Sequence, residues 1–346
     1  MKNVVNLFAN IGVGKAYLED IGFKTIVANE IDPERVAIYE HIYPDVEVVC
    51  GDITLESIQK DILDKIKNRD VELVIATPPC QGFSTLNSKC KDDERNHLIY
   101  HAISLIKDIN PKYVMIENVQ RSLSHVIEGK VLIEWIRDSL SNYDVKAHIM
   151  DSADYGTPQH RRRSIILCGK KSEPKWKLPE KQKKITLRDA IDDLLSLESG
   201  GHDPDEFWHR AHKHSEHHIR WMKHTPTGQS AFDNVKHFPE VTKNGEKRRI
   251  KGFKNTYKRM EWDQPAFTLI AGCTMISSSN TVHPGRPLGN DTYSDARTFT
   301  VLEGMRIMGL PDNWNLPKDT SYRKAMYHIG EGVCPRLVEA LVKSII

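Results

Sequence analysis

Cysteine is scarce in this sequence, and the six cysteines that it has are scattered singly along 346 residues. No two of them form a Cys-x-x-Cys pair, which argues against a disulfide framework and against a thiolate zinc site. We therefore expect no metal centre and a reducing, cytosolic environment for the protein.

Long apolar runs are missing as well. No stretch approaches the roughly 20 apolar residues that a membrane-spanning helix needs, so no membrane partner is expected. The opening residues Met1-Lys2-Asn3 lead straight into a short apolar pattern, which is not the pattern of a signal peptide. A strong charge of one sign is also absent, because the formal net charge is only +2. Hydrophobic residues at 39% and charged residues at 28% are ordinary for a globular protein.

Basic residues nevertheless gather in one segment. Between Val241 and Arg259, eight lysines and arginines accompany a single acid, Glu246. Such a patch suits a polyanion, and it is equally compatible with a solvated surface loop.

The first half of the chain alternates between short apolar runs and amphipathic stretches. The apolar runs predict strands at residues 4–8, 25–29, 46–50, 71–77, 113–117, 144–151 and 164–169. The stretches between them predict helices at residues 15–21, 34–41, 55–66, 100–109 and 129–139. Strands separated by helices of about ten residues indicate crossover connections and a parallel sheet. The expected fold class is α/β, with a doubly wound sheet covered by helices on both faces.

The composition and the periodicity of the sequence change after Gly169. Residues 170–184 are polar, basic and proline-containing, which predicts a linker, and residues 186–197 predict a short helix with Thr186 as its N-cap. From Glu198 to Lys258 the periodicity is weak, which predicts a smaller, irregular second domain. Helical spacing returns at residues 321–325 and 335–343.

A cysteine-containing loop follows the strand predicted at residues 71–77. It reads Thr77-Pro78-Pro79-Cys80-Gln81-Gly82-Phe83-Ser84, and open α/β sheets bind ligands beyond the carboxyl ends of their strands. Two prolines stiffen the approach to Cys80, and Gly82 frees the backbone just past it. A thiolate nucleophile needs such rigid and accessible placement. For this loop alone, a buried cysteine in a proline turn is the plainer explanation.

Two further stretches are placed to converge with that loop. Glu117-Asn118-Val119 ends the strand predicted at 113–117, where a carboxyl can protonate a substrate ring under attack by a thiolate. Gln159-His160-Arg161-Arg162-Arg163 precedes the strand predicted at 164–169. Alternation along an extended chain would put Arg161 and Arg163 on one face, where guanidinium groups suit phosphate or carbonyl oxygens. Taken singly, a turn-forming Glu-Asn pair and a solvated basic turn explain these stretches too.

In this order the three stretches resemble the DNA (cytosine-5)-methyltransferase family. Its Pro-Cys-Gln-x-Phe-Ser pattern is matched by Pro79 to Ser84, its Glu-Asn-Val by Glu117 to Val119, and its Gln-x-Arg-x-Arg by Gln159 to Arg163. Further family marks follow in order: Asn29-Glu30-Ile31-Asp32, Gly51-Asp52-Ile53, Asp93-x-Arg-Asn-x-Leu98, and the segment from Arg297 to Pro311. The likeness covers nearly the whole chain except residues 197–256. The ordered set is far more specific than any single motif.

The resemblance implies a fold, a division into domains and a reaction. The fold would be the Rossmann-like sheet of S-adenosylmethionine-dependent methyltransferases. Residues 1–184 plus 321–346 would form the catalytic and cofactor-binding domain, and residues 185–320 the target-recognition domain and hinge. The reaction would be methylation of cytosine at carbon 5 in a specific duplex DNA sequence, on a base flipped out of the stack. Cys80 would add to ring carbon 6 while Glu117 protonates ring nitrogen 3, and Arg161 and Arg163 would hold the flipped nucleotide.

The same resemblance implies the remaining site residues. The cofactor S-adenosyl-L-methionine would contact Phe8, Asn10, Gly12, Glu30, Ile31, Asp52, Ile53, Pro78, Glu331 and Val333. Among these, Phe8 would lie against the adenine, Glu30 would bind the ribose hydroxyls, and Asp52 would take the adenine amine. The substrate would also contact Gln81, Ser84, Asn118 and Gln159.

Two motifs that line the family's cofactor pocket depart from its usual pattern. In Asn6-Leu7-Phe8-Ala9-Asn10-Ile11-Gly12-Val13-Gly14, Asn6 replaces an acid, and Asn10 and Val13 replace glycines. Asparagine tolerates left-handed backbone angles, so we expect the turn to survive at Asn10, with Gly14 relieving the strain at Val13. In Gly330-Glu331-Gly332-Val333-Cys334-Pro335, Glu331 stands where the family has asparagine.

Histidines crowd the start of the second domain, at His209, His212, His214, His217 and His218. His214 and His218 have the i, i+4 spacing of a metal-binding helix face, but no cysteine or acid motif completes a site. We expect solvated or DNA-contacting histidines in place of a zinc site.

Two other functions fit the same fold. A transfer-RNA cytosine-5 methyltransferase would typically carry a Cys-Phe-Thr signature, which this sequence lacks. A catalytically inactive DNA-binding homologue would keep the fold, and only the altered cofactor motifs favour it. The expected partners are double-stranded DNA and, acting separately, a cognate restriction endonuclease, although a solitary or phage-borne role fits equally. We expect a monomer in the bacterial cytosol or nucleoid.

Overall fold

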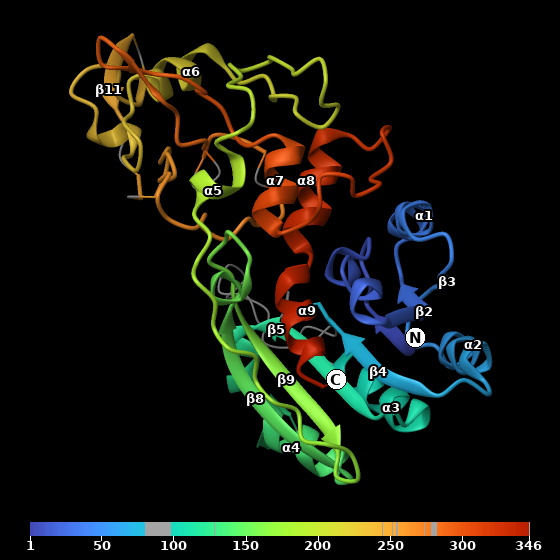
Figure 1. Ribbon diagram of the computed structural model, residues 1–346. Helices are drawn as coiled ribbons and strands as arrows, with labels where there is room; N and C mark the ends of the chain where they lie inside the picture. Colours follow the sequence, from blue (N-terminus) through green and yellow to red (C-terminus); the bar gives the residue numbers. More distant parts are fainter. Residues whose placement is uncertain are drawn as a thin grey trace.

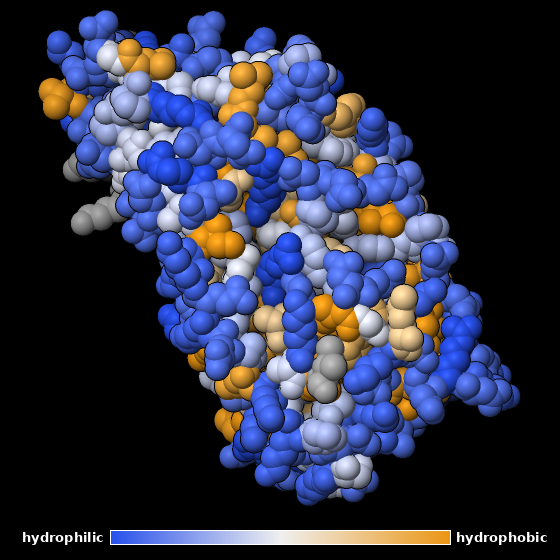
Figure 2. Space-filling model, in the orientation of Figure 1, coloured by the Kyte–Doolittle hydropathy of each residue, from blue (hydrophilic) through white to orange (hydrophobic). Residues whose placement is uncertain are grey.

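Two lobes make up the molecule, a larger one built on a sheet and a smaller one with few regular elements (Figure 1). The computed structural model describes residues 1–79, 98–127, 129–243, 245–250, 252–253, 255–272, 274–277 and 282–345. In this part of the chain, no helix is long and apolar enough to cross a membrane. Hydrophilic side chains dominate the face of the molecule that Figure 2 shows.

A seven-stranded sheet forms the centre of the larger lobe, in the order β3-β2-β1-β4-β5-β9-β8. Its strands are β1 (Lys2–Leu7), β2 (Phe23–Glu30), β3 (Glu47–Cys50), β4 (Val71–Ala76), β5 (Tyr113–Val119), β8 (Tyr143–Asp151) and β9 (Arg162–Lys170). Strands β1 to β5 pair in parallel, which confirms the predicted doubly wound α/β sheet. Strand β9 runs antiparallel to both β5 and β8, which the prediction of a parallel sheet missed. The connection at residues 152–161 is too short for a crossover helix, so β8 and β9 must turn back on each other.

Four of the five helices predicted in the first half are present. They are α1 (Pro33–Ile42), α2 (Glu56–Ile66), α3 (Leu98–Ile109) and α4 (Leu132–Ser139). The helix predicted at residues 15–21 is wrong, because the chain forms two single 3-10 turns there, η1 (Val13–Lys15) and η2 (Glu19–Ile21). Gly12 and Gly22 lie at the two ends of this segment in the left-handed conformation, which ends a helix. The remaining short elements of this lobe are η4 (Gln120–Ser124), β6 (Val126–Ile127), β7 (Lys130–Val131) and η5 (Ser152–Tyr155).

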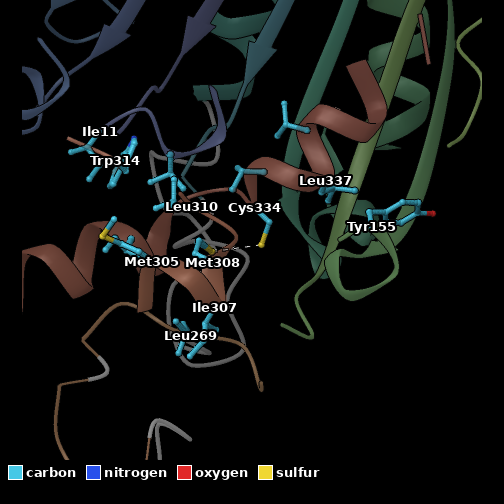
Figure 3. Close-up of a cluster of buried hydrophobic side chains, with 14 of the residues drawn as sticks. Ile11, Tyr155, Leu269, Met305, Ile307, Met308, Leu310, Trp314, Cys334 and Leu337 are labelled. Atoms are coloured by element: carbon cyan, nitrogen blue, oxygen red, sulfur yellow. Dashed lines mark hydrogen bonds between the residues drawn. The ribbon is translucent and has the colours of Figure 1, made fainter. Parts of the chain in front are cut away.

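Successive residues of the strands fill hydrophobic cores on opposite faces of the sheet. Val4 and Leu73 belong to one cluster, whereas their neighbours Val5 and Val74 belong to the other. Helices α2, α3 and α4 complete the second cluster. The first is completed by α7 (Val301–Met308), α8 (Tyr322–Glu331) and α9 (Pro335–Lys343). Figure 3 shows part of it, where Met305, Ile307 and Met308 of α7 lie among side chains from other segments.

The smaller lobe has weak secondary structure, as predicted. Its elements are α5 (Leu187–Ile191), α6 (Glu216–Lys223), η6 (Ala231–Asp233), β10 (Glu240–Lys243), β11 (Glu246–Arg249), β12 (Pro287–Gly289) and β13 (Thr292–Tyr293). Thr186 caps α5 through a capping box with Asp189, as expected, but the helix ends at Ile191, well before residue 197. The core of this lobe is small and consists of Trp221, Met222, Ala231, Ile276, Val282 and Ala296.

Candidate active site

The carboxyl ends of β4 and β5 lie side by side, at the edge of the sheet where the reactive groups were predicted. Strand β4 leads into Thr77-Pro78-Pro79, and Glu117 with Asn118 lies at the end of β5. Cys80, Gln81 and Ser84 lie outside the described residues, so their roles stay predictions. The described residues form the frame that leads into this loop.

Hydrogen bonds from both neighbouring strands fix the backbone that precedes Cys80. The Asn118 side-chain amide donates to the Pro78 carbonyl at 3.2 Å, and its own oxygen accepts from the Val119 N–H at 2.8 Å. On the other side, the Thr77 hydroxyl donates to the Phe8 carbonyl at 2.9 Å. Asn118, predicted as a substrate contact, is therefore placed to hold the loop that carries the predicted nucleophile.

A buried carboxyl and a guanidinium form the polar centre of the site. The antiparallel register of β5 and β9 pairs Val119 with Arg163, and Arg163 Nε lies 3.1 Å from Glu117 Oε1. Glu117 is only 8% exposed. Burial raises the pKa of the Glu117 carboxyl, and the charges of Arg163 and Arg161 oppose that rise. Such a carboxyl can hold a proton at a pH where an exposed glutamate has lost it.

Arg161 and Gln159 both bind backbone groups in the structure. The Arg161 guanidinium donates to the carbonyls of Leu269 and Gly330, both at 2.9 Å. Gln159 is fully buried, donates to the Ile307 carbonyl at 3.3 Å and accepts from the Leu269 N–H at 2.9 Å. Both side chains thus hold neighbouring backbone, and the nucleotide contact predicted for Arg161 and the substrate contact predicted for Gln159 stay predictions. Arg161 is buried, Arg162 is exposed and Arg163 is half-buried, and the charges of Arg161 and Arg163 both lower the pKa of Glu117, so the two arginines share one face as the alternation predicts.

The loop after β1 adopts the left-handed turn expected at Asn10. Phe8, Asn10 and Gly12 have φ angles of 59°, 50° and 79°, and the Asn10 side-chain oxygen accepts from the Ile11 N–H at 2.7 Å. The expectation that Gly14 relieves strain at Val13 is wrong. Val13 lies in the helical turn η1, and Gly332 opposite makes room for its side chain. A Cβ on Gly332 would come within 2.6 Å of Val13 Cβ.

Acids end the strands next to this loop. Glu30, at the end of β2, accepts the Asn10 N–H at 2.8 Å through one oxygen, and the Ile31 and Asp32 N–H groups at 3.1 Å through the other. Asp52, just past β3, accepts the Thr54 N–H at 2.9 Å. An acid at the end of the second strand, beside a loop that follows the first, is the arrangement in which dinucleotide folds bind ribose, and Glu30 has that place.

The remaining predicted cofactor residues differ in exposure. Ile31 is 61% exposed, whereas Ile53 and Val333 are buried. Glu331 accepts a hydrogen bond from Arg35 of α1 at 2.8 Å, so the acid that replaces the family's asparagine has a partner on a neighbouring helix.

His328 is a buried polar group with unused hydrogen-bonding capacity near this loop. Its ring is 6% exposed, and neither ring nitrogen has a hydrogen-bond partner among the described residues. Its carbonyl accepts from the Asn10 side chain at 3.4 Å. A buried group of this kind calls for a polar ligand, so the residues around Asn10 fit a cofactor with polar substituents.

The basic run at residues 241–259 is less available to a polyanion than its composition indicates. Arg259 is fully buried and donates to the carbonyls of Met222 and His283, among others. Lys247 pairs with Glu240 at 2.8 Å. Lys251 and Lys254 lie outside the described residues. Part of the patch predicted to meet a polyanion is thus internal structure.

Two of the five crowded histidines are buried, so the expectation of solvated or DNA-contacting side chains is wrong for them. His209 bonds the Thr300 hydroxyl at 3.0 Å and the Leu195 carbonyl at 2.8 Å. His214 bonds the Thr298 hydroxyl at 3.1 Å, and it lies before α6, which starts at Glu216. Among the described residues, no three histidines, cysteines or acids gather as a metal site would require.

A buried ion network in the smaller lobe was missed. Arg297 donates to both Glu303 oxygens at 2.8 and 2.9 Å and to Asp295 at 2.9 Å, and all three side chains are at most 1% exposed. Glu303 also completes the capping box of Thr300 that begins α7. The sequence Thr300-x-x-Glu303 is the pattern that reveals such a helix start.

Comparisons with known proteins agree with this arrangement. Residues 2–346 match the sequence profile of a family described as C-5 cytosine-specific DNA methylase. The chain is 42% identical to the Type II methyltransferase M1.HgaI of Avibacterium volantium over 99% of this chain and 98% of that protein. Its fold is similar to a prophage-encoded DNA modification methyltransferase (E. coli), with a TM-score of 0.74 and 20% identity over 99% and 98% of the two chains. The S. pombe Dnmt2 methyltransferase aligns with a TM-score of 0.65 and 16% identity, over 99% of this chain and 97% of that one.

Proposed function

Because this chain belongs to the C-5 cytosine-specific DNA methylase family, we propose that Cys80 and Glu117 are the residues with which it methylates cytosine at carbon 5. The observation that carries this assignment is the buried Glu117–Arg163 pair, which lies at the end of β5 beside the strand that leads to Cys80. The backbone before Cys80 is held by Asn118 and Thr77. The proposed nucleophile therefore follows strand β4, and the proposed proton donor lies at the end of the neighbouring strand β5.

The proposed reaction needs the cytosine to leave the DNA stack, because its ring carbons are shielded inside a duplex. The Cys80 thiolate adds to ring carbon 6 while Glu117 gives its proton to ring nitrogen 3. S-adenosyl-L-methionine, when bound, supplies the methyl group that carbon 5 receives. A base then takes the carbon-5 proton, which restores the ring and expels the Cys80 thiolate, and ring nitrogen 3 returns its proton to Glu117. Arg163 holds the Glu117 carboxyl in place.

The cofactor is proposed to lie along the carboxyl ends of β1, β2 and β3. Phe8, Asn10 and Gly12 would shape its loop, Glu30 would meet the ribose, and Asp52 would meet the adenine amine. Pro78, Ile31, Ile53 and Val333 would pack around it. Glu331 would act through its ion pair with Arg35. Arg161 and Gln159 would position the neighbouring backbone.

The biological setting is proposed from the relatives. Type II methyltransferases such as M1.HgaI of Avibacterium volantium span the full length of this chain, so a role in a restriction–modification system is favoured. Residues 185–320 would include the lobe that reads the DNA sequence, with residues 1–184 and 321–346 carrying the chemistry. The protein would act as a monomer in the bacterial cytosol or nucleoid, with a restriction endonuclease acting separately.

Substitution of the nucleophile tests the assignment. We expect Cys80→Ser to abolish transfer of labelled methyl groups from S-adenosyl-L-methionine to duplex DNA, while DNA affinity in a gel-shift titration stays close to wild type. Turnover near wild type in this variant would contradict the assignment of Cys80. Transfer to transfer RNA in place of DNA would favour the RNA-modifying alternative. No cofactor binding by calorimetry would favour an inactive homologue.

A further inference from the structure

Tyr43 joins the loop after β1 to a segment that is distant in the sequence. Its hydroxyl donates to the Gly12 carbonyl at 3.0 Å and accepts from the Trp314 indole N–H at 2.9 Å. Trp314 is 6% exposed and lies after α7. Partly buried hydrogen bonds of this kind cost free energy to break, because water replaces the lost partner only in part.

The ring of Tyr43 also fixes how closely the loop can approach α1. A Cβ on Gly12 would lie 2.5 Å from the Tyr43 ring and 2.9 Å from the Tyr39 ring, so the backbone is packed directly on both rings. The Lys15 ammonium lies 3.7 Å from the centroid of the Tyr43 ring, a cation–π contact that restrains the ring. Gly12 and Lys15, three residues apart, thus both pack on Tyr43.

A second tyrosine ties the same stretch to α7. The Tyr17 hydroxyl donates to the carbonyl of Gly309, the residue that caps the end of α7. The other end of α7 contains Glu303, which is bound to the buried Arg297 of the smaller lobe. The loop after β1 is therefore fastened to a helix whose first turn belongs to the ion network of the other lobe.

We propose that Tyr43 is a positioning residue for the methyl donor, whose hydroxyl, anchored by Trp314, holds the Gly12 carbonyl and keeps the loop at residues 8–12 ready to bind S-adenosyl-L-methionine. This inference rests on the proposed function, since it assumes that the cofactor binds at that loop. Left-handed backbone at Phe8 is strained for a bulky residue and persists only where the surroundings impose it. Without the tyrosine hydroxyl, part of the cofactor's binding free energy would be spent on ordering the loop.

The chain offers a matched control for this proposal. Tyr39 packs on the same glycine, and its hydroxyl lies near Asn6 but makes no hydrogen bond within the described part of the chain. Tyr43→Phe and Tyr39→Phe therefore each remove one hydroxyl from a ring that packs on the loop at residues 8–12. Only Tyr43→Phe removes the hydrogen bonds to Gly12 and Trp314.

Calorimetry of S-adenosyl-L-methionine binding to the full chain, without DNA, measures the effect. We expect Tyr43→Phe to raise the Kd by about five- to tenfold, as the loss of a partly buried hydrogen bond would, and Tyr39→Phe to leave it unchanged. In methylation assays, Tyr43→Phe should raise the KM for the cofactor while kcat at saturating cofactor stays near wild type. A purely structural weakening would instead lower the melting temperature and reduce kcat with it.

The outcomes separate this inference from the function on which it rests. Equal Kd values for wild type, Tyr43→Phe and Tyr39→Phe would overturn the role of Tyr43 and leave the methylase function intact. No binding by the wild type would overturn the proposed cofactor site, and the inference with it. Trp314→Phe should weaken cofactor binding, and the double variant with Tyr43→Phe should bind no more weakly than Tyr43→Phe alone, because both changes break one chain of hydrogen bonds.

Discussion

At the scale of single residues, the chemistry of the site depends on a carboxyl removed from water. Glu117 is buried at the end of a central strand, where desolvation raises its pKa against the pull of two arginines. A proton donor must hold a proton when the substrate arrives, and burial shifts Glu117 in that direction.

Replacing this carboxyl should slow the chemistry and spare cofactor binding. In Glu117→Gln the shape of the side chain is kept, but the amide cannot act as an acid. We expect kcat to fall by about 10² to 10⁴, the range usual for loss of a general acid. In the wild type, turnover should also decline at high pH as Glu117 loses its proton. Glu56→Asn, on the exposed start of α2, serves as the control and should match wild type. Unchanged kcat in Glu117→Gln would remove this residue from the mechanism.

At the scale of elements, α7 carries ion pairs of two kinds. At its start, Glu303 is paired with Arg297, and both side chains are buried. At its end, Arg306 is paired with Asp312, which is half exposed. The two pairs allow the cost of burial to be measured on one helix.

Breaking the buried pair should cost far more than breaking the exposed one. Glu303→Gln leaves Arg297 buried without its full counter-charge, and we expect a loss of about 3–5 kcal/mol in the free energy of unfolding. Asp312→Asn should cost no more than about 1 kcal/mol, as exposed pairs usually do. Urea unfolding of both variants provides the comparison. Similar losses would show that burial of the Arg297–Glu303 pair is unimportant.

Acid should destabilise the same network, to which His283 belongs because its Nε2 lies 3.6 Å from Glu303 Oε1. Burial is the main cause that lowers the pKa of His283 to about 3, and Arg297 adds to it. For Glu303, burial alone would raise the pKa, but the Arg297 charge overcomes it and lowers the pKa to about 2. In both cases the unfolded chain binds the proton more readily, so stability is lost as the pH falls. Protonation of His283 begins to reduce the stability below about pH 6.5, and protonation of Glu303 does so below about pH 4.5, which are the ordinary pKa values of the two side chains. Melting temperatures from pH 8 to pH 3 should fall steadily, and a flat profile would contradict the network's role.

Element prediction succeeded where the sequence has a repeating pattern. The strands of the sheet are continuous apolar runs, so β4 and β5 were located closely, and with them the ends that carry Pro78 and Glu117. The direction of β9 was missed, because strand direction depends on connection length and leaves no mark in the strand itself. In the smaller lobe the structure rests on Arg259 and Arg297, which bind backbone carbonyls and acids. No periodic pattern in the sequence marks a buried arginine of this kind. Arg259 was therefore counted with the basic run at residues 241–259.

At the scale of the whole molecule, the core of the larger lobe includes residues from outside the segments predicted to form the catalytic domain. Phe299, Leu310 and Trp314 lie in the same hydrophobic cluster as Val4 and Leu73 of the sheet. We propose that the recognition lobe ends before α7, and that residues 299–320 belong with the catalytic lobe. Cofactor, nucleophile loop and recognition lobe would then be fixed to a single framework through α7.

The measurement that tests the central claim most directly is bisulfite sequencing of plasmid DNA from cells that express this chain, beside cells that express Cys80→Ser. The account predicts protected cytosines in one fixed sequence context with the wild type and none with the variant. That result would also reveal the recognition sequence. A soluble wild-type protein that protects no cytosine, or a Cys80→Ser variant that protects them equally, would contradict the account.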